Sequence, residues 1–327
     1  QRAEEKGLIF YVGPELEYFY FKKPKPPLET LDEGGYFDLT PLDVASDLRR
    51  DTVLVLQEMG IKVDYSHHEV APSQHEIDLD YTDALTMADQ AMTYRLVVKE
   101  VALRYDVYAT FMPKPLADQN GSGMHVHQSL FRGDRNIFFD ANEPGGLSID
   151  CKRYIAGLLR HGREITLVTN QWVNSYKRLV PGYEAPVYLS WAMRNRSDLI
   201  RVPGYAPGQE KATRIEYRAP DPAANPYLAF AAMLAAGLEG IENEYEVSDP
   251  VEDNVYEMEP EERAARGIDS LPGSLGEAIT EAENSDVLRR ALGDQLLEKL
   301  LENKRIEVDK YRQQVTSWEL DEYLPVL

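Results

Sequence analysis

Acidic and imidazole side chains occur two residues apart at several points of the sequence. Glu15 and Glu17 form one such pair, His125 and His127 are followed at the same spacing by Ser129, and Glu216 lies midway between two arginines. Residues i and i+2 of a β-strand project from the same face, so each set would present its polar groups together. One such pair alone would be typical of a solvent-facing strand. Here the alternate positions are apolar or aromatic, which specifies both faces and favours chemistry; they are Leu16, Tyr18, Met124, Val126, Ile215 and Tyr217.

Two further acids, Glu69 and Glu76, lie on two neighbouring stretches that resemble the arms of a hairpin. With them the set holds five carboxylates and a histidine, and no lysine among them. Gathered in one cavity these acids would repel one another strongly, and only divalent cations make such a cluster tolerable. Oxygen-rich ligand sets favour Mg²⁺ or Mn²⁺ over zinc. We interpret the neighbouring His67 and His68 as turn or supporting residues, because Glu69 is the harder ligand.

The charge of the chain is unevenly distributed. The formal net charge is −21, but residues 152–218 hold 12 Lys or Arg against 5 Asp or Glu, and nine of the twelve are Arg. A planar guanidinium matches phosphate oxygens, so this segment points to a phosphate-bearing ligand. The acidic balance of the whole chain disfavours nucleic acid as a partner.

Composition restricts the class of protein. The 327 residues suffice for two domains or one elaborate domain, and 43% of them are hydrophobic, as in globular proteins. The longest apolar run, 227–238, is too short to span a bilayer. A single cysteine, Cys151, has nothing around it that suggests a nucleophile and is interpreted as a structural thiol. We therefore expect a soluble cytoplasmic protein that binds neither nucleic acid nor membrane.

The elements that must position these residues alternate along the chain. Strands are predicted at 7–21, 62–70, 74–81, 107–112, 122–131 and 213–218, with the second and third forming an antiparallel pair. Helices are predicted from Thr40 to Gly60, from Thr82 to Tyr105, at 152–170 and at 225–243, and more helices fill the C-terminus.

Six segments, in order, closely resemble the catalytic domain of class I (bacterial-type) glutamine synthetases. They are GPELEYF (13–19), HHEVAPSQHE (67–76), NGSGMHVHQSL (120–130), NSYKRLVPGYEAPVY (174–188), RNRS (194–197) and RIEYRAPDPAANPYLAFAAMLAAGL (214–238). Any one segment would be a weak signal, but six collinear ones are specific. The resemblance implies an α+β fold, with a curved, mainly antiparallel sheet surrounded by helices, of the glutamine synthetase/guanido kinase-like type.

The resemblance also implies roles for individual residues. One metal would be held by Glu17, Glu69 and Glu76, and a second by Glu15, His125 and Glu216. Substrate glutamate would contact Arg178, Asn120, Gly121 and Arg218. ATP would contact His127, Ser129, Tyr81, Lys211, Arg214, Arg196 and Arg201. The catalytic residues would be Glu184, Arg196 and Arg218.

The implied reaction joins ammonia to the γ-carboxylate of L-glutamate through γ-glutamyl phosphate, with ATP as the phosphoryl donor and Mg²⁺ or Mn²⁺ as cofactor. Two anions must meet in the first step, which explains a need for metals and arginines. Ammonium must then lose a proton in a site closed to water, because the acyl phosphate would otherwise hydrolyse. The resemblance makes Glu184 the lid and proton acceptor, although an isolated loop glutamate would ordinarily be a solvated surface residue.

Alternatives follow from features the resemblance does not cover. The acceptor could be a larger amine, such as a polyamine, or the chain could be a non-catalytic scaffold.

Residues 1–327 are expected to be one catalytic domain without the small N-terminal β-grasp domain of the family. In the family that domain completes the site of a neighbouring subunit, in a homo-oligomer of two hexameric rings. The segment around Tyr256 follows the family's adenylylation motif only loosely, so we do not predict that modification.

Overall fold

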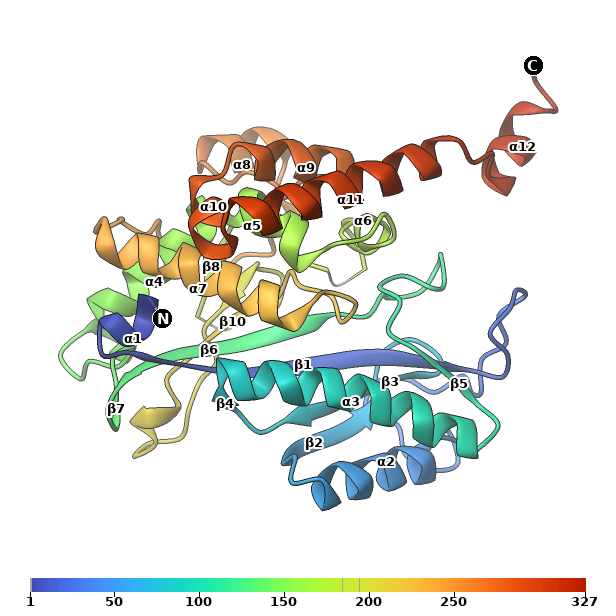
Figure 1. Cartoon of the computed structure of the whole chain (residues 1–327), viewed down its shortest axis with the longest axis horizontal. Helices are drawn as coiled ribbons and strands as arrows, with labels where there is room; N and C mark the ends of the chain where they lie inside the picture. The colour runs from blue at the N-terminus through green and yellow to red at the C-terminus, as the bar shows by residue number, and fades with distance from the viewer. Residues whose placement is uncertain (1, 184, 194) are drawn as a thin grey trace.

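The computed structural model describes residues 2–183, 185–193 and 195–327. Within this part of the chain, ten strands form one sheet around the long strand β1 (Ile9–Phe21) (Figure 1). The sheet order is β2 (Val63–His68), β3 (Gln74–Leu79), β1, β6 (Met124–Arg132), β10 (Ile215–Tyr217), β9 (Ile200–Arg201) and β8 (Trp191–Ala192). Short strands β4 (Thr82–Asp83) and β5 (Tyr108–Thr110) pair with β1, and β7 (Arg135–Asn136) pairs with β6. All of these pairs are antiparallel except β8–β9, which confirms the predicted α+β sheet.

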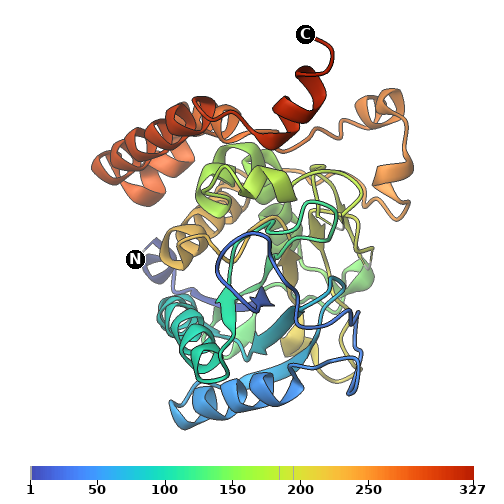
Figure 2. The ribbon, with the colours of Figure 1, turned by 90° about the vertical axis from the view of Figure 1, so that its right-hand side faces the viewer.

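Helices pack around this sheet. Helix α3 (Ala84–Arg104) contacts β1 and the buried helix α7 (Pro226–Glu242), and α2 (Ser46–Glu58) contacts α3 and β2. Helix α7 also packs on α4 (Ile149–Arg160), α5 (Gly162–Thr169) and α10 (Asp286–Leu292). Helices α9 (Leu275–Glu283) and α11 (Asp294–Arg312) form the layer farthest from the sheet, and α12 (Ser317–Tyr323) projects beyond it (Figure 2). The remaining helical segments are α1 (Arg2–Glu5), α6 (Ser175–Arg178), α8 (Pro260–Ala265), η1 (Pro144–Gly146), η2 (Glu210–Ala212) and η3 (Val255–Glu257).

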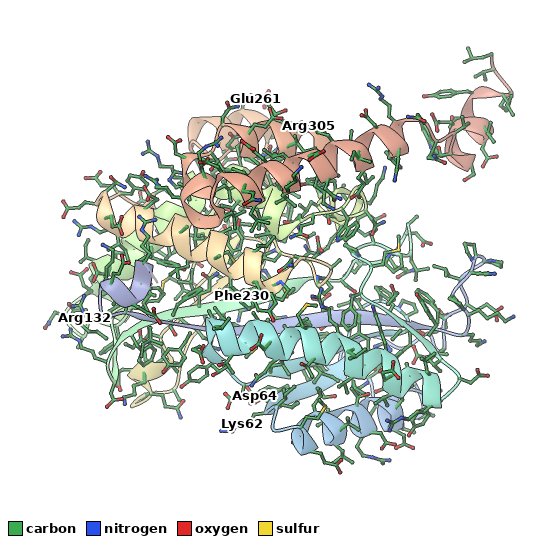
Figure 3. All side chains as sticks on the ribbon, viewed as in Figure 1. Lys62, Asp64, Arg132, Phe230, Glu261 and Arg305 are labelled. Atoms are coloured by element: carbon green, nitrogen blue, oxygen red, sulfur yellow. The ribbon has the colours of Figure 1, made fainter. Side chains whose placement is uncertain are left out.

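The core lies between these helices and the sheet. Phe230 of α7 is 2% exposed, whereas the polar side chains labelled in Figure 3 lie at the periphery of the molecule. Helices α4 and α7 can approach closely because Gly157 has no side chain. A Cβ at this position would collide with the backbone oxygen of Ala236. Of the helices described, none combines the length and apolar composition that crossing a bilayer requires.

Two predicted helices differ from the structure. The helix expected to begin at Thr40 begins at Ser46, because side-chain carboxylates accept hydrogen bonds from the preceding backbone: Asp32 from Val44 and Asp43 from Ala45. The helix predicted at 152–170 is two helices, α4 and α5, that meet at His161. The predicted strands, and the helices predicted at Thr82–Tyr105 and 225–243, are present with ends shifted by a few residues.

Candidate active site

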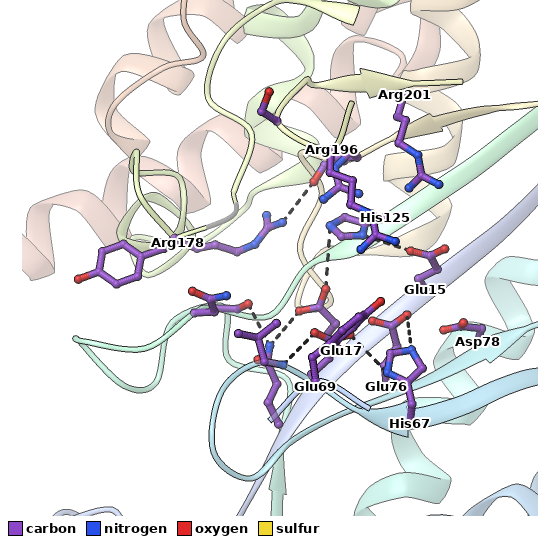
Figure 4. A pocket seen from close by; sticks show the side chains of 18 of the residues that line it. Glu15, Glu17, His67, Glu69, Glu76, Asp78, His125, Arg178, Arg196 and Arg201 are labelled. Atoms are coloured by element: carbon purple, nitrogen blue, oxygen red, sulfur yellow. Dashed lines mark hydrogen bonds and ion pairs between the residues drawn. The ribbon is translucent and has the colours of Figure 1, made fainter. Parts of the chain in front are cut away.

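A cavity of about 690 Å³ opens over one face of the sheet. Acids from β1 and β3 line its floor, and arginines from later segments lie opposite them (Figure 4). Loop aromatic side chains Tyr36, Phe37 and Tyr183 form part of its wall. Of the residues expected to act in catalysis or to contact metal, glutamate or ATP, the cavity is lined by Glu15, Glu17, Glu69, Glu76, Asn120, Gly121, His125, Arg178, Arg196, Arg201 and Arg218.

Strand register explains how residues far apart in the sequence reach this face. Glu15 of β1 lies opposite His125 of β6, and Glu17 lies opposite Glu76 of β3. Directly paired residues of an antiparallel ladder project to the same side of the sheet. Glu216 of β10 follows across the next strand pair, opposite His127. The alternation seen in the sequence therefore becomes one continuous polar face.

The first group of ligating atoms comes from Glu15, His125 and Glu216, which all lie within 4.8 Å of one another. His125 Nδ1 is 3.2 Å from Glu15 Oε2 and 3.7 Å from Glu216 Oε1. Burial and then the Arg218 charge lower the pKa of His125 to about 4, so the ring is neutral and can offer a lone pair. The acids are ionised: burial opposes this for Glu15, but His127 and His125 outweigh it and hold the pKa of Glu15 well below its usual range.

Glu216 is fully buried between two guanidinium groups. Arg201 Nη1 is 2.7 Å from Glu216 Oε2, and Arg218 Nη1 is 2.5 Å from Glu216 Oε1. Burial opposes its ionisation, but Arg218 prevails and lowers the pKa of Glu216. These arginines offset part of the repulsion that the sequence led us to expect among the acids.

The second group of ligating atoms comes from His67, Glu69 and Glu76. His67 lies 3.5 Å from Glu69 Oε1 and 3.6 Å from Glu76 Oε1. Glu17 lies beside them, and its Oε2 accepts hydrogen bonds from Gln74 Nε2 at 2.9 Å and Gly123 N at 3.0 Å. Burial, and then repulsion by Glu69, raises the pKa of Glu17 well above its usual range.

The pKa of Glu76 is raised, as is that of Glu17. Burial, then repulsion by Asp78, Glu15 and Glu69, raises the pKa of Glu76 well above normal. A divalent cation would offset the repulsion among these buried acids, and hard oxygen ligands beside an imidazole fit a divalent metal ion. The residues present therefore fit the divalent metals expected from the sequence.

Sequence reasoning did not name Asp78, and it placed His67 among the turn or supporting residues. Asp78 forms a further group of ligating atoms with Glu15 and Glu76, and burial raises its pKa to about 7. It stands two residues after Glu76 on β3, so the alternation used elsewhere could have found it. His67, which we interpreted as a turn or supporting residue, is buried at the end of β2 and lines the cavity between two acids.

Arg178 is the most buried arginine of the site, at 2% exposure. Its Nη1 donates to the backbone oxygen of Ala219 at 2.7 Å, and Nη2 donates to that of Arg218 at 3.2 Å. Carbonyls orient the guanidinium without neutralising it. A Cβ at Gly121 would lie 3.0 Å from the Arg178 side chain and would collide with the backbone oxygen of Pro113, so glycine permits this close approach.

The remaining residues expected around ATP are not on the cavity wall. His127 Nε2 is 2.6 Å from Glu15 Oε1, and Arg214 Nε donates to His127 Nδ1 at 3.2 Å. Farther along the same strands, Ser129 pairs with Tyr11 of β1, whose ring contacts Tyr81 edge-on. Lys211 is exposed in η2.

Glu184 lies outside the described residues. On either side of it, Tyr183 lines the cavity, and the backbone oxygen of Ala185 accepts a 2.5 Å hydrogen bond from the hydroxyl of Tyr256. Tyr256 also lines the cavity, and burial raises its pKa to about 12. Tyr256 therefore serves here as a hydrogen-bond donor to the 181–186 segment.

Comparison with known proteins agrees with this geometry. Residues 1–323 match the family model described as glutamine synthetase, catalytic domain. The chain is 51% identical over 327 residues to a glutamine synthetase of Thermotoga maritima, covering 99% of this chain and 74% of the relative. It is 52% identical over 330 residues to that of Methanosarcina mazei, covering 100% and 73%.

Solved structures give the same picture. The glutamine synthetase of Plasmodium falciparum is 26% identical with a TM-score of 0.86, covering 98% of this chain and 77% of that one. A complex of GmaS with ADP is 32% identical with a TM-score of 0.89, covering 99% and 75%.

The fold and the family match define the class: the chain belongs to the glutamine synthetase family, whose members use ATP and divalent metal ions. It is a glutamate–ammonia ligase that forms L-glutamine from glutamate and ammonia. A larger amine acceptor and an inactive scaffold are not favoured, because relatives that are 51–52% identical to this chain are named glutamine synthetases.

Proposed function

We propose that this face of the sheet holds two Mg²⁺ or Mn²⁺ ions. One ion is assigned to Glu17, Glu69 and Glu76, and the other to Glu15, His125 and Glu216. The observation that carries the assignment is the pair of buried acids whose pKa values are raised, burial first and neighbouring acids second, beside a neutral histidine. When bound, such ions neutralise phosphate charge and hold the transferring group in line.

The glutamate site is assigned to Arg178, Asn120 and Gly121. Arg178 supports this role because its guanidinium donates hydrogen bonds to neutral backbone carbonyls, which leaves its positive charge for a substrate carboxylate. Burial makes that charge more effective than it would be in water. The α-carboxylate of glutamate would lie against Arg178, with the γ-carboxylate directed toward the acids of the sheet.

The phosphate side is assigned to Arg196, Arg201 and Arg218. Arg201 and Arg218 already contact Glu216, so they lie beside one proposed ion. The rest of ATP would follow the row of residues along β6 and its neighbours, namely His127, Ser129, Tyr81, Lys211 and Arg214. This row starts at the Glu15–His127 contact and leads away from the cavity.

The chemistry has two steps. The γ-carboxylate attacks the terminal phosphorus of ATP, which forms γ-glutamyl phosphate and releases ADP, and Arg196 and Arg218 stabilise the charge of the transferring group. Glu184 then accepts a proton from ammonium, and the resulting ammonia displaces phosphate from the acyl carbon. Tyr256 supports this second role by holding the backbone next to Glu184.

The domain, assembly and location of the protein are also proposals. The match of residues 1–323 to one catalytic-domain model supports a single catalytic domain. We propose a homo-oligomer of ring form, in keeping with the family resemblance, and a cytoplasmic location.

Phosphate release from ATP and glutamate tests the acceptor directly. The protein should release phosphate with ammonium, depend on Mg²⁺ or Mn²⁺, and respond weakly to methylamine or a polyamine at equal concentration. A higher kcat/KM with a larger amine would overturn ammonium as the acceptor. No release with any amine, in a folded protein that binds ATP, would indicate the scaffold.

A further inference from the structure

A buried hydrogen-bonded pair, His68 and Asp32, lies next to the proposed metal ligands. His68 is fully buried, and its two ring nitrogens meet two acceptors: Nδ1 lies 2.6 Å from the backbone oxygen of Glu69, and Nε2 lies 3.1 Å from Asp32 Oδ1. Asp32 Oδ1 also accepts a hydrogen bond from Ser73 N at 2.9 Å, so this carboxylate is an acceptor. A carbonyl cannot donate either, and both ring nitrogens must therefore carry hydrogen. His68 therefore links the Asp32 carboxylate to the backbone of Glu69 through two hydrogen bonds.

This pair is not a third metal site, although Asp32, His68 and His75 lie close enough to hold an ion. Both nitrogens of His68 are committed as donors, and a metal ligand needs a free lone pair. His75 Nδ1 faces the Arg49 guanidinium at 2.9 Å, which would repel a cation. The group serves to connect segments of the chain.

This pair connects the β2–β3 hairpin, which carries the proposed metal ligands Glu69 and Glu76, to the loop of residues 34–38. Gly34 packs against His68 so closely that a Cβ there would lie 2.8 Å from Nε2. Three residues on, Phe37 N donates to the backbone oxygen of His68 at 3.0 Å. The Phe37 ring then stacks on the His67 ring, with centroids 4.4 Å apart and planes 10° apart. Phe37 itself adopts φ = +59°, a strained backbone for this residue that the surrounding contacts must maintain.

We propose that Asp32 and His68 are positioning residues, which hold the 34–38 loop over His67 and fix the backbone of Glu69, and thereby set the affinity of the adjacent divalent-metal site. The inference rests on the proposed function, since it takes Glu69 and Glu76 as metal ligands. His68 donates to the Glu69 carbonyl directly, and Phe37 confines the imidazole that lies between Glu69 and Glu76. Neither Asp32 nor His68 touches the substrate.

The test is a Mn²⁺ titration of the full chain, by electron paramagnetic resonance and by the metal dependence of glutamine synthesis. Asp32→Asn keeps the shape of the side chain and removes its charge. It should raise the Mn²⁺ concentration for half-saturation about 10-fold, the lower end of what a residue supporting a ligand contributes. Because the ligands themselves remain, kcat at saturating Mn²⁺ should recover.

Asp43→Asn is the matched control. Asp43 is buried on the same segment and pairs with Arg49 Nη2 at 2.8 Å. Its hydrogen bonds with Ala45 and Leu39 lie outside the 34–38 loop and do not involve Glu69. It should lower thermal stability and leave the Mn²⁺ half-saturation unchanged. A half-saturation in Asp32→Asn equal to the unsubstituted protein, or an equal shift in Asp43→Asn, would overturn the inference.

Two further variants keep the outcome decisive. If Asp32→Asn does not fold, Phe37→Ala replaces it: the side chain is 56% exposed, and its loss should weaken Mn²⁺ binding in the same direction, whereas unchanged binding overturns the inference. Glu76→Gln tests the metal site itself. Normal Mn²⁺ binding in Glu76→Gln refutes the proposed metal site, and lost binding there with normal binding in Asp32→Asn refutes only the positioning role.

Discussion

Replacing Glu216 by Gln removes one charge at the point where the proposed metal site and the arginine cluster meet. The side chain is fully buried and keeps its shape in the substitution. Repulsion by Glu15 alone would make the loss of this charge stabilising. The structure reverses that sign, because Arg218 and Arg201 contact both carboxylate oxygens and lower the pKa of Glu216, against the effect of burial.

The magnitude follows from these contacts. Arg218 has a side-chain exposure of 8%, so the variant would leave a buried guanidinium facing a neutral amide. Removing one partner of a buried pair costs about 3–5 kcal/mol, and we expect the lower end since the Gln oxygen can still accept one hydrogen bond. Metal should act in the opposite direction. At 100 times Kd each bound ion stabilises the native state by about 2.7 kcal/mol, and the variant should lose this contribution from one of two sites.

Urea unfolding with EDTA and with Mn²⁺ measures both effects. The variant should be less stable by about 3 kcal/mol without metal and should gain about half as much from Mn²⁺ as the unsubstituted protein. Glu239→Gln is the control, because Glu239 is also buried and paired with two arginines, Arg2 and Arg290, outside the cavity. It should keep the full response to Mn²⁺. A Glu216→Gln protein of unchanged stability and unchanged Mn²⁺ response would refute the reasoning.

Three further substitutions test other parts of the site. Arg178→Met should raise KM for glutamate on the order of 100-fold, the effect of losing a buried charge pair, and should leave ATP binding measured by equilibrium dialysis intact; an unchanged KM would exclude Arg178 from the glutamate site. Glu184→Gln should still release phosphate from ATP and glutamate but form little glutamine, as measured by chromatography, and full glutamine synthesis would return Glu184 to an ordinary loop residue. Burial raises the pKa of Asp198 to about 7, so the native state binds a proton that the unfolded state releases at lower pH, and native stability falls as pH rises from about 4 to 7. Asp198→Asn should therefore match the unsubstituted protein at pH 4 and exceed it at pH 8 by up to about 4 kcal/mol in urea unfolding, whereas a difference independent of pH would contradict this sign.

Patterns of side chains along the strands predicted much of the fold and of the site. Strands β1, β3, β6 and β10 occur where the sequence predicted strands, and the alternation of side chains grouped Glu15 with Glu17 and His125 with His127. Register then brought these groups together, as pairing of Glu15 with His125 shows. The division of the 152–170 segment into two helices at His161 was not predicted.

Other features had no local signal in the sequence. The contact of Glu216 with Arg201 depends on pairing between β10 and β9, and β9 has only two residues. Phe37 reaches His67 from a loop whose conformation is fixed by Asp32 and His68, through hydrogen bonds between residues more than 30 apart. Such contacts become visible only when the chain is folded, because they depend on tertiary packing and not on periodicity.

We propose that this face of the sheet activates glutamate as an acyl phosphate, and an isotope-transfer measurement tests this activation directly. Glutamate labelled with ¹⁸O in its γ-carboxylate is converted with ATP, ammonium and Mn²⁺, and the phosphate is analysed by mass spectrometry. Attack of the carboxylate on the terminal phosphorus predicts that each phosphate released carries one ¹⁸O, and that chelating the metal or substituting Glu76→Gln abolishes the transfer. Phosphate that carries no ¹⁸O while glutamine accumulates would contradict the account.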